Sequence, residues 1–267
     1  MLIRGILLRI IVLLICHNMK VIRGHLRDKA AVDRALRERY ACSMRRLLKL
    51  SGFLVGQFLL FSVVAMAFYP GGNHVEHRTE RYELFSNTFS ELGRVRTYTG
   101  EPKPISRHIF STSVSVAGIG VLLFLLGLSF HIRRAGIHRE RKSLLVVALL
   151  FGVLTAGGFE LIALSPADTA FELHFVGVYS AFTGFLPTAL CFGQLLRRGN
   201  GADREASRVL FAFSLLLVAY VVLIYFGPTV QTPEGHEIQV VAQKTIVYAG
   251  IGTIAAVAHV LGRRRSG

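Results

Sequence analysis

The stretch from Val209 to Phe226, VLFAFSLLLVAYVVLIYF, runs for eighteen residues without a single charge. A helix needs about 20 mostly apolar residues to cross the hydrocarbon layer of a membrane, because that layer is about 30 Å thick and each residue adds about 1.5 Å. Gly227 and Pro228 follow directly and mark the point where such a helix ends. This stretch therefore predicts a membrane-spanning helix.

Five other segments of the 267-residue chain have the same character. Hydrophobic residues make up 52% of the chain, charged residues 18%, and the mean hydropathy is +0.50, which excludes a soluble enzyme domain as the main body of the protein. We predict an all-α, polytopic membrane bundle of six transmembrane helices. The spans expected besides Val209–Phe226 are Leu50–Phe68, Ser111–Phe130, Ser143–Ser165, Phe171–Leu196 and Val241–Leu261.

The distribution of Lys and Arg predicts the orientation, because cytoplasmic loops retain positive charge and short translocated loops avoid it. Ten basic residues lie between Lys20 and Lys49, five follow the second span, four follow the fourth, and three are in the tail. The short connections 165–170 and 228–240 contain none. We therefore predict that both termini are cytoplasmic and that residues 71–110 form a long outer loop.

The net charge of +15 follows from this topology. Basic residues at a membrane surface are attracted to anionic lipids by roughly 1 kcal/mol each. Membrane lipids are therefore the partners that the charge pattern indicates, and nucleic acid is not expected as a partner. Protein partners cannot be inferred from these charges.

Three parts of the chain are expected. Residues 1–49 form a basic cytoplasmic segment, in which the short apolar stretch up to Cys16 is interrupted by two arginines and suits an interfacial helix better than a span. Residues 50–262 form the six-helix transmembrane domain, and residues 263–267 form a basic cytoplasmic tail. Met19, directly before the basic stretch, is an alternative start of the protein.

Polar side chains gather at the predicted outer ends of the spans. Such groups point to function, because a polar group near the bilayer is costly unless it faces protein or water. Glu160 lies near the outer end of the third span, Asp168 in the connection that follows, and His174 in the first turns of the fourth span. The remaining members are in the outer loop and the sixth span: Asn87, Ser90, Glu91 and Lys244.

These side chains can supply an acid and a base, or can ligate a divalent metal. The catalytic candidates are Ser90, Glu91 and His174; the metal candidates are Glu160, Asp168 and His174; the candidates for a lipid or ligand pocket are Asn87, Glu160, Asp168 and Lys244. A structural alternative exists, since carboxylates at helix ends often only cap the helix. An ion pair between Glu160 and Lys244 would account for those two residues.

The string Asn87-Thr88-Phe89-Ser90-Glu91-Leu92-Gly93 resembles a motif of the prokaryotic six-span family known as DUF998. Pro104-Ile105-Ser106, Phe110 and the turn from Ser165 to His174 also match that pattern. The family commonly has Ser-Asp-Leu-Gly before its second span, and Glu91 here replaces the Asp. The resemblance covers roughly residues 50–261 and implies a six-span protein with no established activity. The plan is more distantly similar to the eukaryotic Frag1/DRAM/Sfk1 membrane proteins.

The combination of Ser, carboxylate and His is also similar to the alkaline-ceramidase type of intramembrane hydrolase. In that type, Ser, Asp and His residues surround a zinc ion, so this second resemblance implies zinc as a cofactor. The sequence departs from the pattern because it lacks paired histidines at four-residue spacing.

The sequence favours a multi-pass membrane protein whose outward-facing polar pocket binds a lipid head group, and the family resemblance favours the plasma membrane. A metal-dependent intramembrane hydrolase of lipid amide or ester bonds is one alternative, so the question of an enzyme stays open. A small-solute transporter is another. The hydrolase requires a set of metal ligands, whereas the transporter requires a polar path that Glu160 and Lys244 would line.

Overall fold

The computed structural model describes residues 29–137 and 141–263. The chain divides into two compact units, residues 1–41 and 42–267, and the candidate site lies entirely in the second. The predicted interfacial helix, the alternative start at Met19 and all but the first residue of the basic tail fall outside the described residues.

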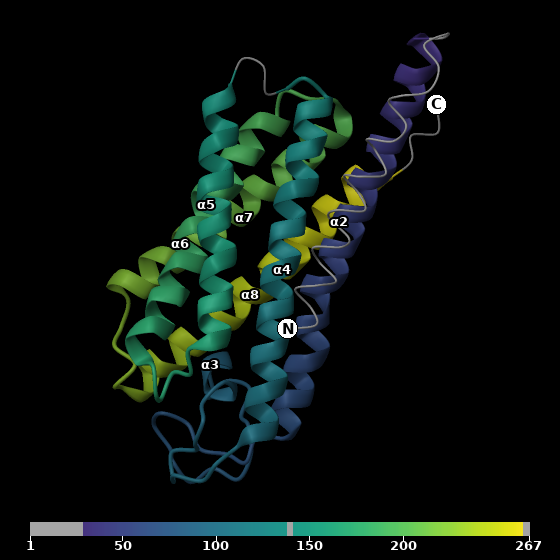
Figure 1. Ribbon diagram of the computed structural model, residues 1–267. Coiled ribbons are helices and arrows are strands. Elements are labelled where there is room, and N and C mark those ends of the chain that lie inside the picture. Colours follow the sequence, from purple (N-terminus) through teal and green to yellow (C-terminus); the bar gives the residue numbers. More distant parts are fainter. Residues whose placement is uncertain (1–28, 138–140, 264–267) are drawn as a thin grey trace. The chain divides into compact units, whose positions relative to one another are not determined.

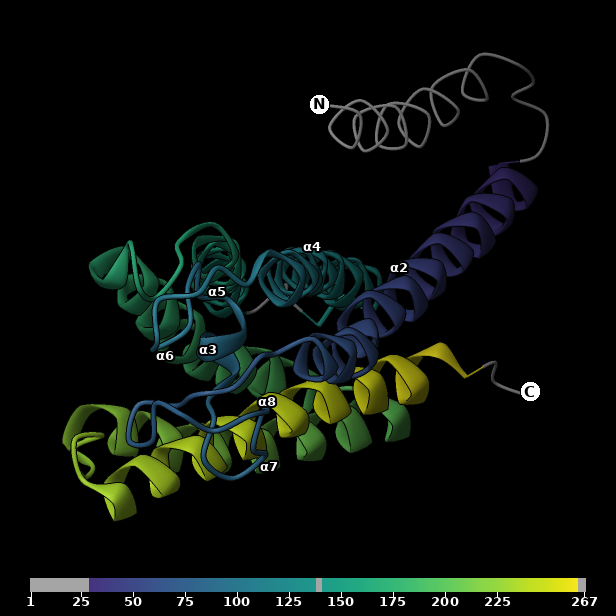
Figure 2. The ribbon, with the colours of Figure 1, turned by 90° about the horizontal axis from the view of Figure 1, so that it is seen from below.

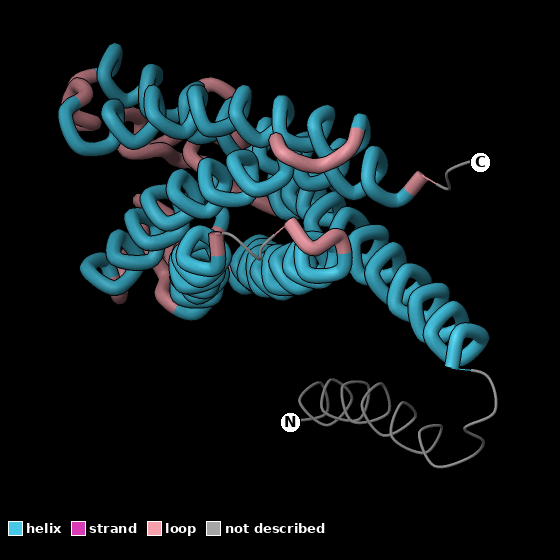
Figure 3. The backbone as a smooth tube through the Cα atoms, turned by 90° about the horizontal axis from the view of Figure 1, so that it is seen from above, coloured by secondary structure: helices cyan, strands magenta, loops and turns pink. Residues whose placement is uncertain are grey.

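Within the described residues the structure consists of helices joined by loops (Figures 1 and 3). The only β-type pairing among them is an isolated bridge between Arg96 and Pro102. Across residues 29–137 and 141–263, which the structure describes, six helices are long and apolar enough to cross a membrane, which confirms the predicted all-α bundle of six spans. The helices are α2 (Lys29–Ala67, spanning from Cys42), α3 (Phe89–Leu92), α4 (Pro104–Arg134), α5 (Lys142–Leu164), α6 (Phe171–Leu196), α7 (Gly201–Phe226) and α8 (Pro233–Gly262).

Some helices begin earlier than the apolar runs that predicted them. α7 starts at Gly201 rather than at Val209, because the Asn200 side chain accepts the N–H of Asp203 and the Asp203 carboxylate accepts the N–H of Asn200. α8 likewise starts at Pro233, before its apolar run. A helix needs satisfied backbone groups at its ends, and hydropathy does not report them.

The six spanning helices form a ring in which neighbours along the chain pack together. α4 contacts α5, α5 contacts α6, α6 contacts α7, and α7 contacts α8. α2 closes the ring, since its Gly52 faces Ala258 of α8 and its Val55 lies against Gly120 of α4. The short helix α3 contacts α4 and α8 at the end that carries residues 68–103, viewed in Figure 2. We call this end of the ring the loop end.

Large apolar side chains cover the outside of the ring. Phe53 is 71% exposed, Leu164 is 77% exposed and Phe226 is 84% exposed. Exposing each such side chain to water would forgo about 1.5–3 kcal/mol, whereas lipid tails solvate it well. The surface of the ring therefore suits a hydrocarbon surrounding.

Glycine permits the close contact between α5 and α6. A Cβ atom at Gly158 would lie 2.5 Å from the backbone nitrogen of Ala181 and 2.7 Å from the carbonyl oxygen of Gly177. The neighbouring Gly157 has no such atom within 4 Å. Small residues allow helix backbones to approach closely in membranes, and here only one of two adjacent glycines has that role.

We expect the Gly158→Ala variant to be less stable than the wild type by about 1–3 kcal/mol, because α5 and α6 must move apart to accommodate the methyl group. Gly157→Ala is the matched control and should be at least as stable as the wild type, since Ala favours a helix by about 1 kcal/mol over Gly. Thermal unfolding of the detergent-solubilised proteins measures both. Equal melting temperatures for the two variants would contradict the packing described here.

Candidate functional site

The motif around Ser90 forms α3, a single helical turn held by its own caps. The Thr88 hydroxyl accepts the N–H of Glu91 at 3.3 Å, and the Glu91 carboxylate accepts the N–H of Thr88 at 2.8 Å. This reciprocal pair is a capping box. Gly93 ends the turn, and a Cβ atom there would lie 2.9 Å from the ring of Phe110. The sequence therefore specifies a capped turn packed closely on α4.

The Glu91 carboxylate is buried and accepts four hydrogen bonds. Oε1 accepts the N–H of His74 at 3.1 Å and the hydroxyl of Tyr98 at 2.9 Å. Oε2 accepts Nδ2 of Asn87 at 2.9 Å and the N–H of Thr88. Burial raises the pKa of Glu91, while the bonds from Asn87, Tyr98 and Thr88 oppose that rise. The carboxylate thus ties separate parts of the loop to α3.

Asn87 connects this network to the bundle. Its Nδ2 also donates to the carbonyl oxygen of Gly72 at 2.8 Å, and its Oδ1 accepts the N–H of Glu83 at 2.8 Å. Its own carbonyl oxygen accepts the hydroxyl of Tyr82 at 2.9 Å and the ammonium group of Lys244. Because Lys244 belongs to α8, its ammonium group fastens the loop to a spanning helix.

Ser90 and His174 join α3 to α6. The Ser90 hydroxyl lies 2.9 Å from Nε2 of His174, and Nδ1 of the same ring lies 2.8 Å from the carbonyl oxygen of Ser165. His174 is only 2% exposed. Both ring nitrogens of this histidine are therefore engaged within the protein.

Asp168 holds the loop to the connection between α5 and α6. Its carboxylate accepts the N–H of Val95 at 3.0 Å and the N–H of Arg96 at 2.9 Å. Partial burial acts to raise the pKa of Asp168, but the backbone hydrogen bonds and the Arg94 cation outweigh it, and the net pKa lies below its usual value. The hydrogen bonds of Asp168 therefore suit an ionised carboxylate that holds the loop in place.

Lys103 lies directly before α4 and is buried. Its Nζ donates to the carbonyl oxygen of Leu92 at 2.9 Å and lies 4.8 Å from the centre of the Tyr69 ring. Burial lowers the pKa of Lys103 to about 7, against the attraction of Asp168. A large fraction of this side chain is consequently neutral at neutral pH.

Glu160 lies apart from these residues, in α5. Its Oε2 accepts the hydroxyl of Ser115 in α4 at 2.6 Å, and its buried Oε1 has no partner among the described residues. Lys244 instead donates to Asn87. The two side chains thus have separate partners in the described structure, in place of the ion pair that the sequence left open.

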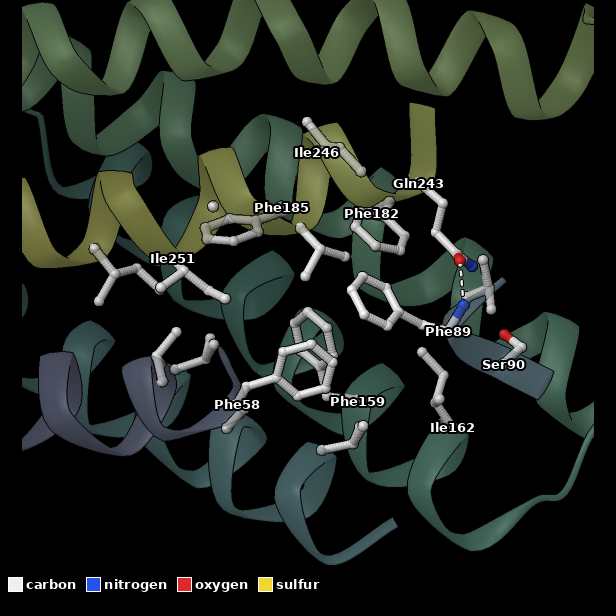
Figure 4. Close-up of a pocket in the computed structure, with 18 of the residues that line it drawn as sticks. Phe58, Phe89, Ser90, Phe159, Ile162, Phe182, Phe185, Gln243, Ile246 and Ile251 are labelled. Atoms are coloured by element: carbon white, nitrogen blue, oxygen red, sulfur yellow. Dashed lines mark hydrogen bonds between the residues drawn. The ribbon is translucent and has the colours of Figure 1, made fainter. Parts of the chain in front are cut away.

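An apolar cavity of about 90 Å³ lies inside the ring, lined by all six spanning helices and by α3 (Figure 4). Its walls are aromatic and aliphatic, with Phe58 and Phe182 among them. Its polar lining residues are Ser90 and Gln243, and the Gln243 Oε1 accepts the N–H of Phe89 at 2.8 Å. Both polar side chains therefore lie at the loop end of the cavity.

The structure brings some of the predicted site residues together and separates others. Those that meet are Ser90 with His174 and Asn87 with Glu91 and Lys244, whereas Glu160 and Asp168 have other partners. Of all these residues, Ser90 is the one that lines the cavity. In the part of the chain that the structure describes, no three His, Cys, Asp or Glu side chains are placed to hold a metal ion. This donor set does not fit the zinc site that the ceramidase-like resemblance implies.

Sequence reasoning missed Tyr98 and Lys103, which belong to the same network of buried polar groups. Tyr98 gave no signal, because a tyrosine in a long polar loop is unremarkable by composition. Lys103 gave none either, because the predicted second span begins only at Ser111 and Lys103 falls inside the predicted long outer loop.

The fold and the site define a multi-pass membrane helix bundle with a polar network at one end and an apolar cavity inside. The family described as "Protein of unknown function (DUF998)" matches residues 55–260, and the chain belongs to this family, as the motif around Ser90 led us to expect. No curated protein matches the chain, and no solved structure does. The distant likeness to the Frag1/DRAM/Sfk1 proteins stays a prediction.

Glu91→Gln should destabilise the protein, because each carboxylate oxygen accepts a backbone N–H, from His74 or from Thr88, that cannot be re-aimed. Whichever way the Gln amide turns, its NH₂ group faces donors, and each donor left unpaired costs about 1–3 kcal/mol. Thermal unfolding in detergent measures the loss. The exposed Glu80→Gln variant is the control and should melt with the wild type. An unchanged melting temperature for Glu91→Gln would contradict the network.

Lys103 predicts a specific pH dependence of stability. Its pKa is about 7 in the fold, against a usual 10.5, so the unfolded chain binds more protons between these values. The contribution of Lys103 to stability is therefore present above pH 10.5 and is lost as pH falls towards 7, with a slope of at most about 1.4 kcal/mol per pH unit. Lys103→Met removes this titration.

We expect the stability of the wild type relative to Lys103→Met to rise when the pH is raised from about 7 to about 9, inside the window that the two pKa values define. Melting temperatures of both proteins at each pH give this difference, and the titration of other groups cancels in the comparison. A difference that stays constant, or that falls as the pH rises, would contradict the depressed pKa.

Proposed function

We propose that the protein binds the hydrocarbon part of a membrane amphiphile in the cavity, with the polar part of that molecule beside Ser90 and Gln243. The observation that carries this proposal is the division of the cavity into two regions. Its walls are apolar, and its two polar side chains share the loop end. An amphiphile is likewise divided into an apolar hydrocarbon chain and a polar head group.

The size and the apolar walls of the cavity support an apolar occupant. A single water needs about 10–15 Å³ of such space, so a cavity of about 90 Å³ accommodates several groups of that size. Water gains few hydrogen bonds among Phe58, Phe182 and the aliphatic walls, and apolar cavities tend to stay dry. A stretch of hydrocarbon chain would instead form dispersion contacts with every wall.

The polar end of the cavity suggests where the ligand comes from. With the orientation that the basic residues predict, the loop end faces the outer side of the membrane. The polar part of the ligand would then lie at the level of the outer leaflet, where lipid head groups are available. This orientation is part of the proposal.

Two alternatives receive less support from the geometry. A metal-dependent hydrolase needs a set of metal ligands, which the described residues do not offer. A transporter with Glu160 and Lys244 along its path needs them in the cavity wall, and neither residue lines this cavity. Binding of an amphiphile requires only an apolar cavity with polar side chains at one end, and the described residues supply both.

Native mass spectrometry of the detergent-solubilised protein, titrated with palmitoyl lysophosphatidylcholine, tests the proposal. We expect one bound lipid for the wild type. Ala117 lines the cavity, so Ala117→Phe should fill it and raise the Kd for the lipid by at least about tenfold, which corresponds to about 1.4 kcal/mol.

Gly252→Phe is the matched control, since Gly252 is an exposed position of α8 with no atom within 4 Å of an added Cβ. It adds the same side chain outside the cavity and should retain the lipid. The proposal is overturned if the wild type binds no lipid, or if both phenylalanine variants bind it as the wild type does.

A further inference from the structure

The hydrogen bonds around His174 fix the direction in which protons can move. The Ser165 carbonyl oxygen can only accept, so Nδ1 of a neutral His174 ring carries the hydrogen. Nε2 then presents a lone pair, and the Ser90 hydroxyl donates to it across 2.9 Å. A hydroxyl, a base that accepts its proton, and a third group that orients the base are the three parts of an activated serine nucleophile.

Ser90 is also the member of this arrangement that reaches the cavity. Figure 4 shows Ser90 and Gln243 at the same end of the cavity. A hydrocarbon chain within the apolar walls would therefore bring its polar end towards the Ser90 hydroxyl. The Ser90 nucleophile thus lies at the edge of the proposed binding region.

Gln243 supplies a further part. Its Oε1 faces the N–H of Phe89, at 2.8 Å, which fixes which way the amide is turned. Gln243 lines the polar end of the cavity, and no hydrogen bond within the described residues engages its Nε2, so this group has two N–H donors to offer a ligand. A donor beside a nucleophile can stabilise the negative charge that develops on a carbonyl oxygen under attack.

We propose that Ser90, with His174 as its base and Gln243 as a carbonyl donor, carries out acyl transfer on fatty acyl esters bound in the cavity, without a metal ion. This proposal rests on the proposed binding of an amphiphile, and it names the substrate class and the reaction of the same site. Ser165 positions the histidine ring through its carbonyl oxygen. A carbonyl stabilises the imidazolium less than a carboxylate would, so turnover is expected to be slow compared with a Ser-His-Asp enzyme.

In the first half of the reaction, Ser90 Oγ forms a bond to the carbonyl carbon of the ester, and its proton moves to Nε2 of His174. The carbonyl oxygen becomes an oxyanion that accepts from Nε2 of Gln243. The carbon–oxygen bond to the alcohol then breaks, and the departing alcohol oxygen takes the proton from His174. The products of this half are an acyl ester of Ser90 and the free alcohol.

In the second half, a water molecule, or a second alcohol, attacks the acyl carbon and gives its proton to Nε2 of His174. The bond from the acyl carbon to Oγ breaks, and Oγ takes the proton back. Water as the acceptor releases the fatty acid, whereas an alcohol yields a new ester. No oxidant, reductant or metal is needed for this balance.

Hexadecyl fluorophosphonate tests the proposal, because a nucleophilic serine forms a bond to its phosphorus while fluoride leaves. Intact-mass analysis of the wild type should give one adduct, which peptide mapping locates on Ser90. Ser90→Ala should give none. His174→Gln should label more slowly by at least about 100-fold, the usual contribution of a general base.

Two further variants sharpen the result. Gln243→Glu keeps an acceptor for the N–H of Phe89 but removes the donor, and its labelling should slow by about 100-fold or more. Ser113→Ala is the control, since Ser113 is a buried serine of α4 that donates only to Phe110 in its own helix, and it should label at the wild-type rate. If Ser90→Ala fails to fold, the mapped adduct of the wild type decides the question.

The proposal is overturned if the wild type is not labelled, if the adduct lies on another residue, or if His174→Gln labels at the wild-type rate. Retention of palmitoyl lysophosphatidylcholine, measured on the same samples, separates the two proposals. A wild type that retains this lipid but is not labelled overturns acyl transfer and leaves binding in place. A wild type that is labelled on Ser90 but retains no lipid overturns binding in the cavity and supports the nucleophile alone.

Discussion

The loop end of the bundle depends on the hydrogen bonding of one buried carboxylate. Removing a carboxylate from water is costly unless its lone pairs are met, and the Glu91 carboxylate is met by two backbone N–H groups, an amide and a phenol. Because these donors come from separate parts of the loop, the carboxylate fixes the position of α3. α3 then places Phe89 and Ser90 in the wall of the cavity. The position of Ser90 therefore depends on the hydrogen bonds that satisfy the neighbouring Glu91 carboxylate.

The six spans could be predicted because the requirement that defines them is local. A bilayer demands an uninterrupted apolar run, and Val209–Phe226 satisfies that demand within its own eighteen residues. The starts of α7 and α8 could not be placed from the same signal, since Asn200 and Thr232 fix them through side-chain caps. The helix α3 was also missed as an element, because a single turn has no periodicity to detect even when its motif is recognised.

The pairing of the site residues could not be predicted, because the partners lie far apart in the sequence. Composition and position predicted a polar cluster that included Glu160 and Asp168, and within it the structure connects Ser90 with His174 and Asn87 with Glu91 and Lys244. The partners could not be read from the chain, because Ser90 and His174 are 84 residues apart and Asn87 and Lys244 are 157 apart. The apolar cavity escaped a search for polar groups altogether, since its walls look like any other apolar stretch of a membrane helix. Only the arrangement of the helices creates it.

The hydrogen bonds that hold α3 have a consequence for the rigidity of the site. Moving α3 away from the rest of the loop would break the bonds that Glu91 accepts from His74 and Tyr98, whereas those from Asn87 and Thr88 are local to α3, and each bond to a charged group contributes about 1.5–3 kcal/mol. A displacement of that cost is seldom populated. A ligand would therefore meet Ser90 and Gln243 already in place, so little of its binding free energy would be spent on ordering the polar end of the cavity.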